Sequence, residues 1–370
     1  MTSLAPGAMT VGWGIIGSSG WARSTFAPAI VAADNARLVA VLGTNAASVE
    51  AFKASVGDCK GYTDIAAFLA DPEVKVVWIA SSTRLHCEHA LACRHAGKHV
   101  LVEKPLAARL DDAAAILAAY GGGSGRLTCS LPNVVLERSL HVASVGYHNR
   151  YNPSLQTLRR HIFDGRLGDI LFLHVQFLFW HGPARDCPTE RGRIEASTAH
   201  GGGFAIDWVG THLLDIVGFL TGQVPLRLLS STLSNRIFGL AADDHCTLVL
   251  APGGGGGGTF VVTTSTGVGS DPSSLIEVHG TKSHVTLRNF FFGGGDLVVT
   301  PNGGSPQATA FAPVNLFEQQ VRAVSAAVMG GAWGGGPEPC LPLDVIVPSL
   351  ETSLENVRLL QIAKEATEHQ

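Results

Sequence analysis

The sequence predicts an α/β fold with a doubly wound parallel sheet in its first half and an α+β fold in its second half. In the first half, apolar strands and helices alternate four times, which is typical of right-handed βαβ units and a parallel sheet. After Leu226 the pattern changes to short strands in close succession, which favour an antiparallel sheet with hairpin connections. A chain of 370 residues also suits two domains of ordinary size.

The boundary between these domains is expected just before His148. We assign residues 9–147 to the first domain and residues 148–370 to the second, which closes with a helix over 350–366. Residues 121–140 begin with a run of glycines and show no clear period, so we interpret them as an inserted surface loop near the boundary.

Composition and charge restrict the class of partner. The net charge is -4, which gives no electrostatic attraction to nucleic acid or to an anionic membrane. The seven cysteines form no C-x-x-C pair, and their odd number argues against a disulfide framework. The first residues lack the pattern of a secretory signal, and no run of about eighteen apolar residues occurs. We therefore expect a cytoplasmic protein that binds a small molecule, with neither nucleic acid nor a membrane as partner.

The first strand, Val11–Ile16, runs directly into a glycine turn and then a helix. This is the context in which a dinucleotide is bound, because glycine lets the backbone approach the pyrophosphate and the start of the helix neutralises its charge. The turn departs from the ideal G-x-G-x-x-G, and similar turns occur in α/β proteins that bind no nucleotide. The candidate cofactor residues in this turn are Gly17, Ser18, Ser19, Gly20, Trp21 and Ala22.

Two further strands end in polar residues that suit a cofactor. The strand 37–42 is followed by Thr44 and Asn45, where an NAD-preferring site usually carries an acid for the ribose 2′-hydroxyl. The missing acid slightly favours NADP over NAD. The strand 74–80 is followed by Ser81, Ser82 and Thr83, whose hydroxyls reach a cofactor or cap the next helix. Helices are expected over 48–55, 62–70, 86–96 and 111–120.

The helix 86–96 carries His86, His89, Cys93 and His95, which superficially resemble a metal cluster. Of the histidines, only His86 and His89 share a helical face, and no fourth ligand follows in tetrahedral register. The sequence therefore predicts no metal site there.

The apolar strand that begins at His99 ends abruptly in Glu103-Lys104-Pro105. Such a strand delivers its charged residues to the carboxyl edge of the sheet, where open α/β sheets bind their ligands. A lysine before proline is restricted to extended conformations, and a tight turn here is compatible with a cis bond. We interpret Lys104 as facing a nicotinamide and the oxygen that is oxidised or reduced, the alternative being an ordinary solvated lysine.

In the second half, three glycines at 201–203 open into a helix that carries Asp207, His212 and Asp215. A histidine among acids suits proton transfer near neutral pH, although a single buried histidine is more often structural. A helix is expected over 155–163. The strands expected from the domain boundary onwards are 142–147, 170–178, 226–233, 245–251, 259–266, 275–280 and 283–288.

Together these motifs resemble the Gfo/Idh/MocA family of NAD(P)-dependent oxidoreductases. The matching stretches are Gly14–Ala22, Ala96–Ala107, Val145–Pro153, Gly201–Asp215 and His279–Leu287, so the resemblance covers nearly the whole chain. It implies a Rossmann domain, followed by an α+β domain whose large, mostly antiparallel open sheet often mediates assembly into a dimer or tetramer. It also implies an enzyme that transfers hydride between NAD(P) and a sugar, polyol or related carbonyl compound.

The resemblance also implies roles for individual residues. Lys104 and His212 match the family's catalytic lysine and histidine, which handle the reacting oxygen and its proton. Glu103 and His86 resemble ribose and nicotinamide contacts. Arg150 and Tyr151 resemble substrate-side groups; with Lys104, Asp207 and His212 they complete the predicted substrate site.

The spacing of Asp207 departs from the family pattern. Most relatives place the acid four residues before the histidine, on the same helical face, whereas Asp207 precedes His212 by five. Unless a bulge accommodates the extra residue, Asp207 is displaced from the site, and it equally fits a helix cap. This departure favours a rival hypothesis, a non-catalytic family member that senses a dinucleotide or sugar. Substrate choice is expected to depend on residues 180–200, which include His181, Arg185, Arg191 and Arg193.

Overall fold

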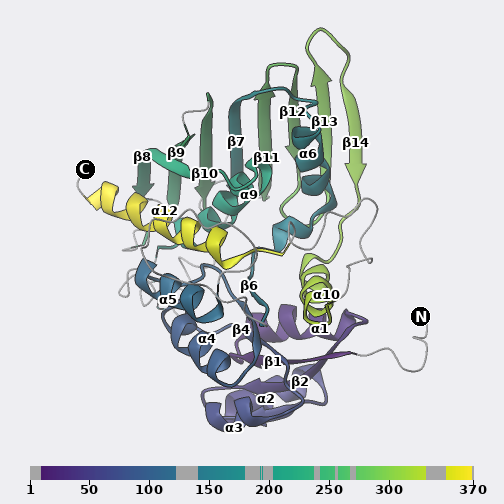
Figure 1. Ribbon diagram of the computed structural model, residues 1–370, viewed down its shortest axis with the longest axis vertical. Coiled ribbons are helices and arrows are strands. Elements are labelled where there is room, and N and C mark those ends of the chain that lie inside the picture. Colours follow the sequence, from purple (N-terminus) through teal and green to yellow (C-terminus); the bar gives the residue numbers. More distant parts are fainter. Residues whose placement is uncertain are drawn as a thin grey trace. The chain divides into compact units, whose positions relative to one another are not determined.

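The computed structural model divides into two compact units (Figure 1). The first lies within Met1–Ala107, Asp111–His148 and Asn315–Glu351, and the second within Ala108–Leu110, Asn149–Val314 and Thr352–Gln370. The residues described are 10–121, 141–179, 192, 194, 203–236, 242–254, 257–266, 272–330 and 347–368.

The first unit is built on a six-stranded parallel sheet with the strand order β3-β2-β1-β4-β5-β6. This is the doubly wound order of dinucleotide-binding folds, and it confirms the predicted parallel sheet. The point where the order reverses lies between β1 and β4. The strands are β1 (Val11–Ile16), β2 (Ala36–Leu42), β3 (Lys60–Tyr62), β4 (Val76–Ile79), β5 (His99–Val102) and β6 (Ala143–Val145).

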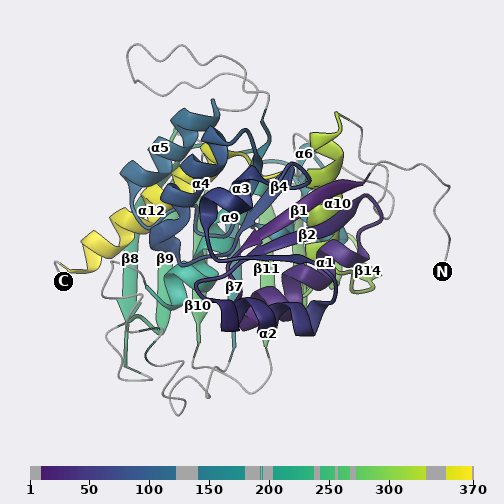
Figure 2. The ribbon, with the colours of Figure 1, turned by 90° about the horizontal axis from the view of Figure 1, so that it is seen from below.

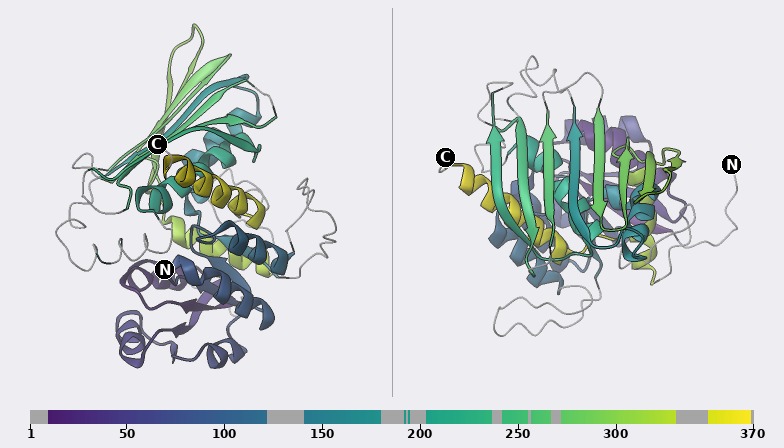
Figure 3. Two further views of the ribbon diagram at one scale, coloured as in Figure 1. Left: turned by 90° about the vertical axis from the view of Figure 1, so that its left-hand side faces the viewer. Right: turned by 90° about the horizontal axis from the view of Figure 1, so that it is seen from above.

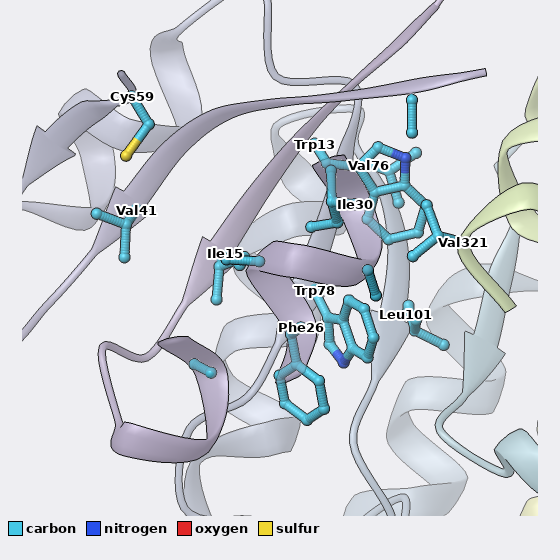
Figure 4. Close-up of a cluster of buried hydrophobic side chains, with 14 of the residues drawn as sticks. Trp13, Ile15, Phe26, Ile30, Val41, Cys59, Val76, Trp78, Leu101 and Val321 are labelled. Atoms are coloured by element: carbon cyan, nitrogen blue, oxygen red, sulfur yellow. The ribbon is translucent and has the colours of Figure 1, made fainter. Parts of the chain in front are cut away.

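One face of this sheet is covered by α1, α2 and α10 (Figure 2). The core on this face is aromatic: Trp78 and Phe26 stack with ring centroids 4.1 Å apart, and Trp13 lies 6.1 Å from Trp78 (Figure 4). On the opposite face, a Cβ on Gly14 would lie 2.6 Å from the ring of Phe68, so α3 packs directly against β1. The helices are α1 (Ala27–Ala32), α2 (Ala46–Val56), α3 (Ile65–Ala70), α4 (His86–His95), α5 (Leu110–Tyr120) and α10 (Leu316–Val328).

One local prediction in this unit was wrong. The helix expected over 62–70 is the short strand β3 followed by α3, because the Asp64 side chain accepts the N–H of Ala67 and caps a helix that begins at Ile65. The helix predicted after the glycine turn is present, and it contains a π-helical turn, Ala22–Phe26, before α1. Neither feature follows from the spacing of apolar residues.

The second unit is built on an eight-stranded sheet with the order β14-β13-β12-β11-β7-β10-β9-β8 (Figure 3). Every pair is antiparallel except β7 with β10, which confirms the predicted mostly antiparallel sheet. The strands are β7 (Ile170–Leu178), β8 (Leu226–Ser234), β9 (His245–Pro252), β10 (Thr259–Ser265), β11 (Ser273–Gly280), β12 (Ser283–Arg288), β13 (Gly295–Pro301) and β14 (Gln307–Phe311).

Buried and partly buried residues alternate along the central strands, so one face of this sheet carries the core. The helical elements assigned to this unit are α6 (Pro153–Phe163), the π-helical turn η4 (Ile206–Gly210), α9 (Thr211–Thr221) and most of α12 (Leu350–Glu368). Short 3₁₀ turns are η2 (Thr83–Leu85) and η3 (His148–Tyr151). Strands β13 and β14 and helix α10 had not been predicted. The expected loop 121–140 falls outside the described residues except at Gly121, as do Gly201, Gly202 and nearly all of 180–200.

Candidate functional site

The predicted cofactor loops of the first unit meet at the carboxyl edge of its sheet. The N–H groups of Gly17, Ala80, Glu103 and Gly146 each donate to the carbonyl oxygen of the last residue of a neighbouring strand, at 2.8–2.9 Å. These four residues therefore form one row across the sheet. The loops that follow them, including Lys104, start side by side at the edge where α/β sheets bind ligands.

The glycine turn fits a dinucleotide pyrophosphate. Gly17 has φ +118°, and a Cβ there would lie 2.6 Å from the carbonyl oxygen of Ala80, so only glycine is tolerated. Ser19 Oγ accepts the N–H of Ala22 at 3.1 Å and caps the helical segment that follows. Ser19 and Gly20 are exposed, Ser18 is partly exposed, and Ala22 is buried. The turn thus combines a close backbone approach with a helix start, as an anion site requires.

Thr44 and Asn45 lie exposed after β2, where the ribose-binding acid of NAD-preferring sites is usually found. Asn45 Oδ1 accepts the N–H of Ser48 at 2.9 Å and caps α2, and its amide lies 3.3 Å from Thr44 Oγ1. No carboxylate is supplied by these two positions, so nothing at them repels a 2′-phosphate.

Lys104 is the second residue after β5, and its bond to Pro105 is cis. Glu103 beside it accepts a hydrogen bond from Trp78 Nε1 at 2.9 Å. Burial raises the pKa of Glu103, while the charge of Lys104 and the Trp78 hydrogen bond oppose that rise. The indole therefore fixes the glutamate, and Glu103 and Lys104 lie close enough for the charge of the lysine to act on the carboxyl group.

His148, a residue that sequence reasoning did not select, belongs to the same edge. It lies two residues beyond Gly146, and its ring packs on Phe317 with centroids 4.4 Å apart. Burial, together with the positive charge of Lys104, lowers the pKa of His148 to about 3, so the imidazole is neutral at pH 7. The register of β6 against β5 is the signal that would have pointed to it.

His86 connects two of the loops at this edge. It is 1% exposed, with Nδ1 3.0 Å from the Pro105 carbonyl oxygen and Nε2 3.2 Å from that of Ser81. Burial lowers its pKa to about 4, so at pH 7 the ring is neutral; it lies between the loops after β4 and β5 and donates to one of the two carbonyl oxygens. Ser81 Oγ lies 2.9 Å from His89 Nδ1, and Thr83 is partly exposed in η2. Contact of these side chains with a cofactor stays a prediction.

In the second unit, Arg150 is committed to a buried ion pair. Its Nε donates to Asp215 Oδ2 at 2.8 Å and its Nη2 donates to Oδ1 at 2.5 Å, with both side chains at most 3% exposed. Nη2 also lies 3.2 Å from Thr352 Oγ1. Tyr151 is 1% exposed and its hydroxyl is buried. These contacts give Arg150 a structural function, and its predicted contact with substrate is not tested by them.

Asp207 lies in the π-helical turn η4, and His212 follows in α9. The N–H of Thr211 donates to the carbonyl of Ile206, five residues earlier. A π turn holds one residue more than an α turn, so a five-residue spacing across it corresponds to a four-residue spacing in an α-helix. The bulge therefore accommodates the extra residue in the sequence. His212 is 4% exposed and meets the ring of Phe291 edge-on at 5.7 Å.

Asp207 is also tied to the start of its helix. Its Oδ2 accepts the N–H of Gly203 at 2.6 Å and pairs with Lys364 Nζ of α12 at 2.8 Å. Asp207 lies within η4 and not at its N-cap, which is Ala205, so it is not the capping residue that the alternative required; its carboxylate instead reaches back to Gly203. Asp243 and Lys364 are further residues at this helix start that sequence reasoning missed, because both are far from Asp207 in the chain.

The described residues contain neither a metal-binding cluster nor a helix suited to crossing a membrane. Within them, no group of three or more histidine, cysteine, aspartate or glutamate side chains is arranged to hold a metal ion. Nor does that part of the chain contain a helix of the length and apolar character that a membrane crossing requires.

Comparison with known proteins places these observations in a family. Residues 11–127 match the model of an oxidoreductase family with an NAD-binding Rossmann fold, and residues 155–286 match the GFO/IDH/MocA C-terminal domain. A 1,5-anhydro-D-fructose reductase of Ensifer adhaerens is 27% identical over 322 residues, which are 86% of this chain and 88% of that protein.

Two solved structures share the fold. A 3-ketoreductase from Actinomadura kijaniata in complex with NADP and TDP-benzene is 18% identical, with a TM-score of 0.75, and the alignment covers 97% of this chain and 98% of that one. A levoglucosan dehydrogenase in complex with NADH and levoglucosan is 18% identical, with a TM-score of 0.76 and 98% of each chain covered. With both domain models matched over more than half of its length, the chain belongs to the Gfo/Idh/MocA family of NAD(P)-dependent oxidoreductases.

Proposed function

We propose that this protein transfers a hydride between NAD(P) and a sugar, polyol or related carbonyl compound. The observation that carries the proposal is the row of loops at the carboxyl edge of the first sheet, where the Gly17 turn and Lys104 lie on the same edge. A phosphate-binding turn and a lysine at one sheet edge suit a cofactor whose nicotinamide reaches the lysine. The names of relatives, which are reductases and dehydrogenases of sugars, support the substrate class.

In this proposal the protein handles the oxygen and its proton. When bound, NAD(P) supplies or takes up the hydride at the nicotinamide ring. The Lys104 ammonium donates a hydrogen bond to the reacting oxygen and stabilises the negative charge that develops on it. His212 takes the hydroxyl proton during oxidation and returns it during reduction. Asp207, one turn before His212, is proposed as a third catalytic group because η4 accommodates its extra residue.

Neutral His148 beside Lys104 fits the same scheme. A neutral imidazole adds no positive charge next to the ammonium, so it does not repel the protonated lysine. Glu103, which precedes Lys104 in the chain, also interacts electrostatically with the lysine. We propose that the remaining predicted cofactor residues contact the dinucleotide as the family resemblance implies, with NADP slightly preferred because Thr44 and Asn45 provide no carboxylate.

The direct test is titration of the purified protein with NADPH and with NADH, followed by energy transfer from tryptophan to the nicotinamide. Binding of either cofactor leads to a screen of anhydrosugars, aldoses and polyols in both directions. We expect NADPH to bind at least as tightly as NADH. If folded protein binds neither, the hydride-transfer proposal fails, and the sensing alternative then requires a sugar ligand without a cofactor.

The proposal includes assembly into a dimer or tetramer through the second sheet. Phe172, His174 and Gln176 of β7 point away from the core face and are only partly exposed. Analytical ultracentrifugation tests this, and a monomer at micromolar concentration would contradict it. A cytoplasmic location stays a prediction.

A further inference from the structure

A group of charged side chains surrounds the start of η4 in the second unit, and two of them have no part in the proposed reaction. Asp243 lies in the connection between β8 and β9, and Lys364 lies in α12, 157 residues after Asp207 in the chain. Both act on the first turn of the segment that carries Asp207 and His212.

Asp243 fastens the start of this helical segment. Its Oδ1 accepts the N–H of Phe204 and its Oδ2 accepts the N–H of Ile206, both at 2.7 Å, and the residue is 8% exposed. A Cβ on Gly203 would lie only 2.4 Å from Asp243 Oδ1, so the third glycine of the motif is needed for this close approach. The carboxylate thereby satisfies two N–H groups that a helix start leaves without partners.

Asp207 is held at one oxygen and leaves the other unused. Its Oδ2 receives both the Gly203 N–H and the Lys364 ammonium, at 2.6 and 2.8 Å. Its Oδ1 is buried and accepts no hydrogen bond from any residue in the described part of the chain. Asp207 as a whole is only 8% exposed, so little solvent is available to supply the missing donor. A buried carboxylate oxygen without a donor is costly, so it indicates a ligand group that donates to it.

We propose that Lys364 and Asp243 are positioning residues that hold Asp207 so that its Oδ1 accepts a hydrogen bond from a hydroxyl group of the sugar or polyol. Lys364 immobilises Oδ2 and supplies the positive charge that two neighbouring carboxylates require. Asp243 fixes the helical turn from which Asp207 projects. This inference rests on the proposed function, since it assigns a hydroxyl-bearing substrate to the same site.

The charges around Asp243 provide a further readout, the pH dependence of activity. This readout would not shift if Lys364 served only to stabilise the fold. The titratable groups that act on it are Asp207 from η4 and Lys364 from α12, while Cys246 of β9 responds to the same charges. Burial raises the pKa of Asp243 to about 6, the negative charge of Asp207 adds to the rise, and Lys364 opposes it. Removing the ammonium therefore raises the pKa of Asp243 further.

The experiment compares Lys364→Met, which removes the charge, with Lys364→Arg, which keeps it. For Lys364→Met we expect kcat/KM for the sugar to fall about 10- to 100-fold, as small misplacements of positioning groups do. The KM for the cofactor stays unchanged, and the acidic limb of the pH profile moves to higher pH. Lys364→Arg recovers most of the activity. The matched control is Lys53→Met, which removes a surface lysine that pairs with Glu50 at 3.0 Å.

The possible outcomes distinguish a failure of this inference from a failure of the proposed hydride-transfer function. If the wild-type protein is active and Lys364→Met has the same kcat/KM and pH profile, the inference is overturned and the proposed function stands. If the wild-type protein converts no sugar or polyol, the proposed function fails and the inference fails with it. Thermal unfolding checks the fold of each variant. Should Lys364→Met not fold, Lys364→Gln, which keeps an N–H donor without the charge, is judged by the same criteria.

Discussion

The buried ion pair between Arg150 and Asp215 is expected to be a main determinant of the stability of the second unit. Two hydrogen bonds join the partners at 2.8 and 2.5 Å, and the side chains are 3% and 1% exposed. Removing one partner of such a pair leaves a buried charge without compensation, which costs about 3–5 kcal/mol. Replacing both partners by apolar residues of similar volume is often nearly neutral.

The perturbation is therefore Arg150→Met, Asp215→Leu and the double variant. For a unit of this size, about 3–5 kcal/mol corresponds to a fall in Tm of roughly 6–20 °C for each single variant. We expect the double variant to recover most of that loss. Burial raises the pKa of Asp215 and Arg150 opposes the rise, so in Arg150→Met the lone carboxyl takes up a proton. A carboxyl group whose pKa is higher in the folded than in the unfolded protein lowers the free energy of unfolding as the pH rises. We therefore expect Arg150→Met to be less stable at pH 8 than at pH 5.

Differential scanning calorimetry of the four proteins measures the coupling. The control is Arg37→Met, which breaks an exposed pair with Glu73 at 2.8 Å and should change stability by no more than about 1 kcal/mol. The reasoning is refuted if Arg150→Met destabilises the protein no more than the control does. If the double variant is stable but no longer binds the substrate of the wild-type protein, Arg150 contacts substrate, as the family resemblance implied.

Three further predictions concern the site and its surroundings. Lys104→Met should lower kcat by about 10²- to 10⁴-fold while the Kd for NADPH stays within about twofold, because the lysine acts on the reacting oxygen. If turnover and NADPH affinity fall together, Lys104 contacts the cofactor instead. Gly17→Ala should abolish cofactor binding, since its Cβ would meet the Ala80 carbonyl at 2.6 Å, whereas Gly57→Ala, also at positive φ but with nothing within 4 Å, should leave binding intact in the same titration. The pKa of Asp243 is raised to about 6, so the free energy of unfolding of the wild-type protein should decline relative to that of Asp243→Asn as the pH rises from about 4 to 6. Urea unfolding measures both proteins at the two pH values, and an unchanged difference between them would contradict this prediction.

The pattern of local residues determined several strands of both units. Val11–Ile16 and Ile170–Leu178 are strands at the predicted bounds, because an unbroken or alternating apolar run ended by glycine or a polar turn is a local signal. Lys104 follows its strand for the same reason. In contrast, Lys60–Tyr62 is a strand only because it pairs with Ala40–Leu42, and three residues with a central glycine carry no periodic pattern.

The sequence by itself determined the family, the parallel and antiparallel sheets, and the residues around the glycine turn and Lys104. Only the tertiary structure decided that Arg150 pairs with Asp215, that His148 lies beside Lys104, and that Lys364 reaches Asp207. These contacts join residues far apart in the chain, so no local window contains both partners. The one-residue π bulge between Asp207 and His212 is also invisible to a count of apolar spacing, because the hydrogen bonds of the folded helix, stabilised by Asp243, decide where the extra residue is accommodated.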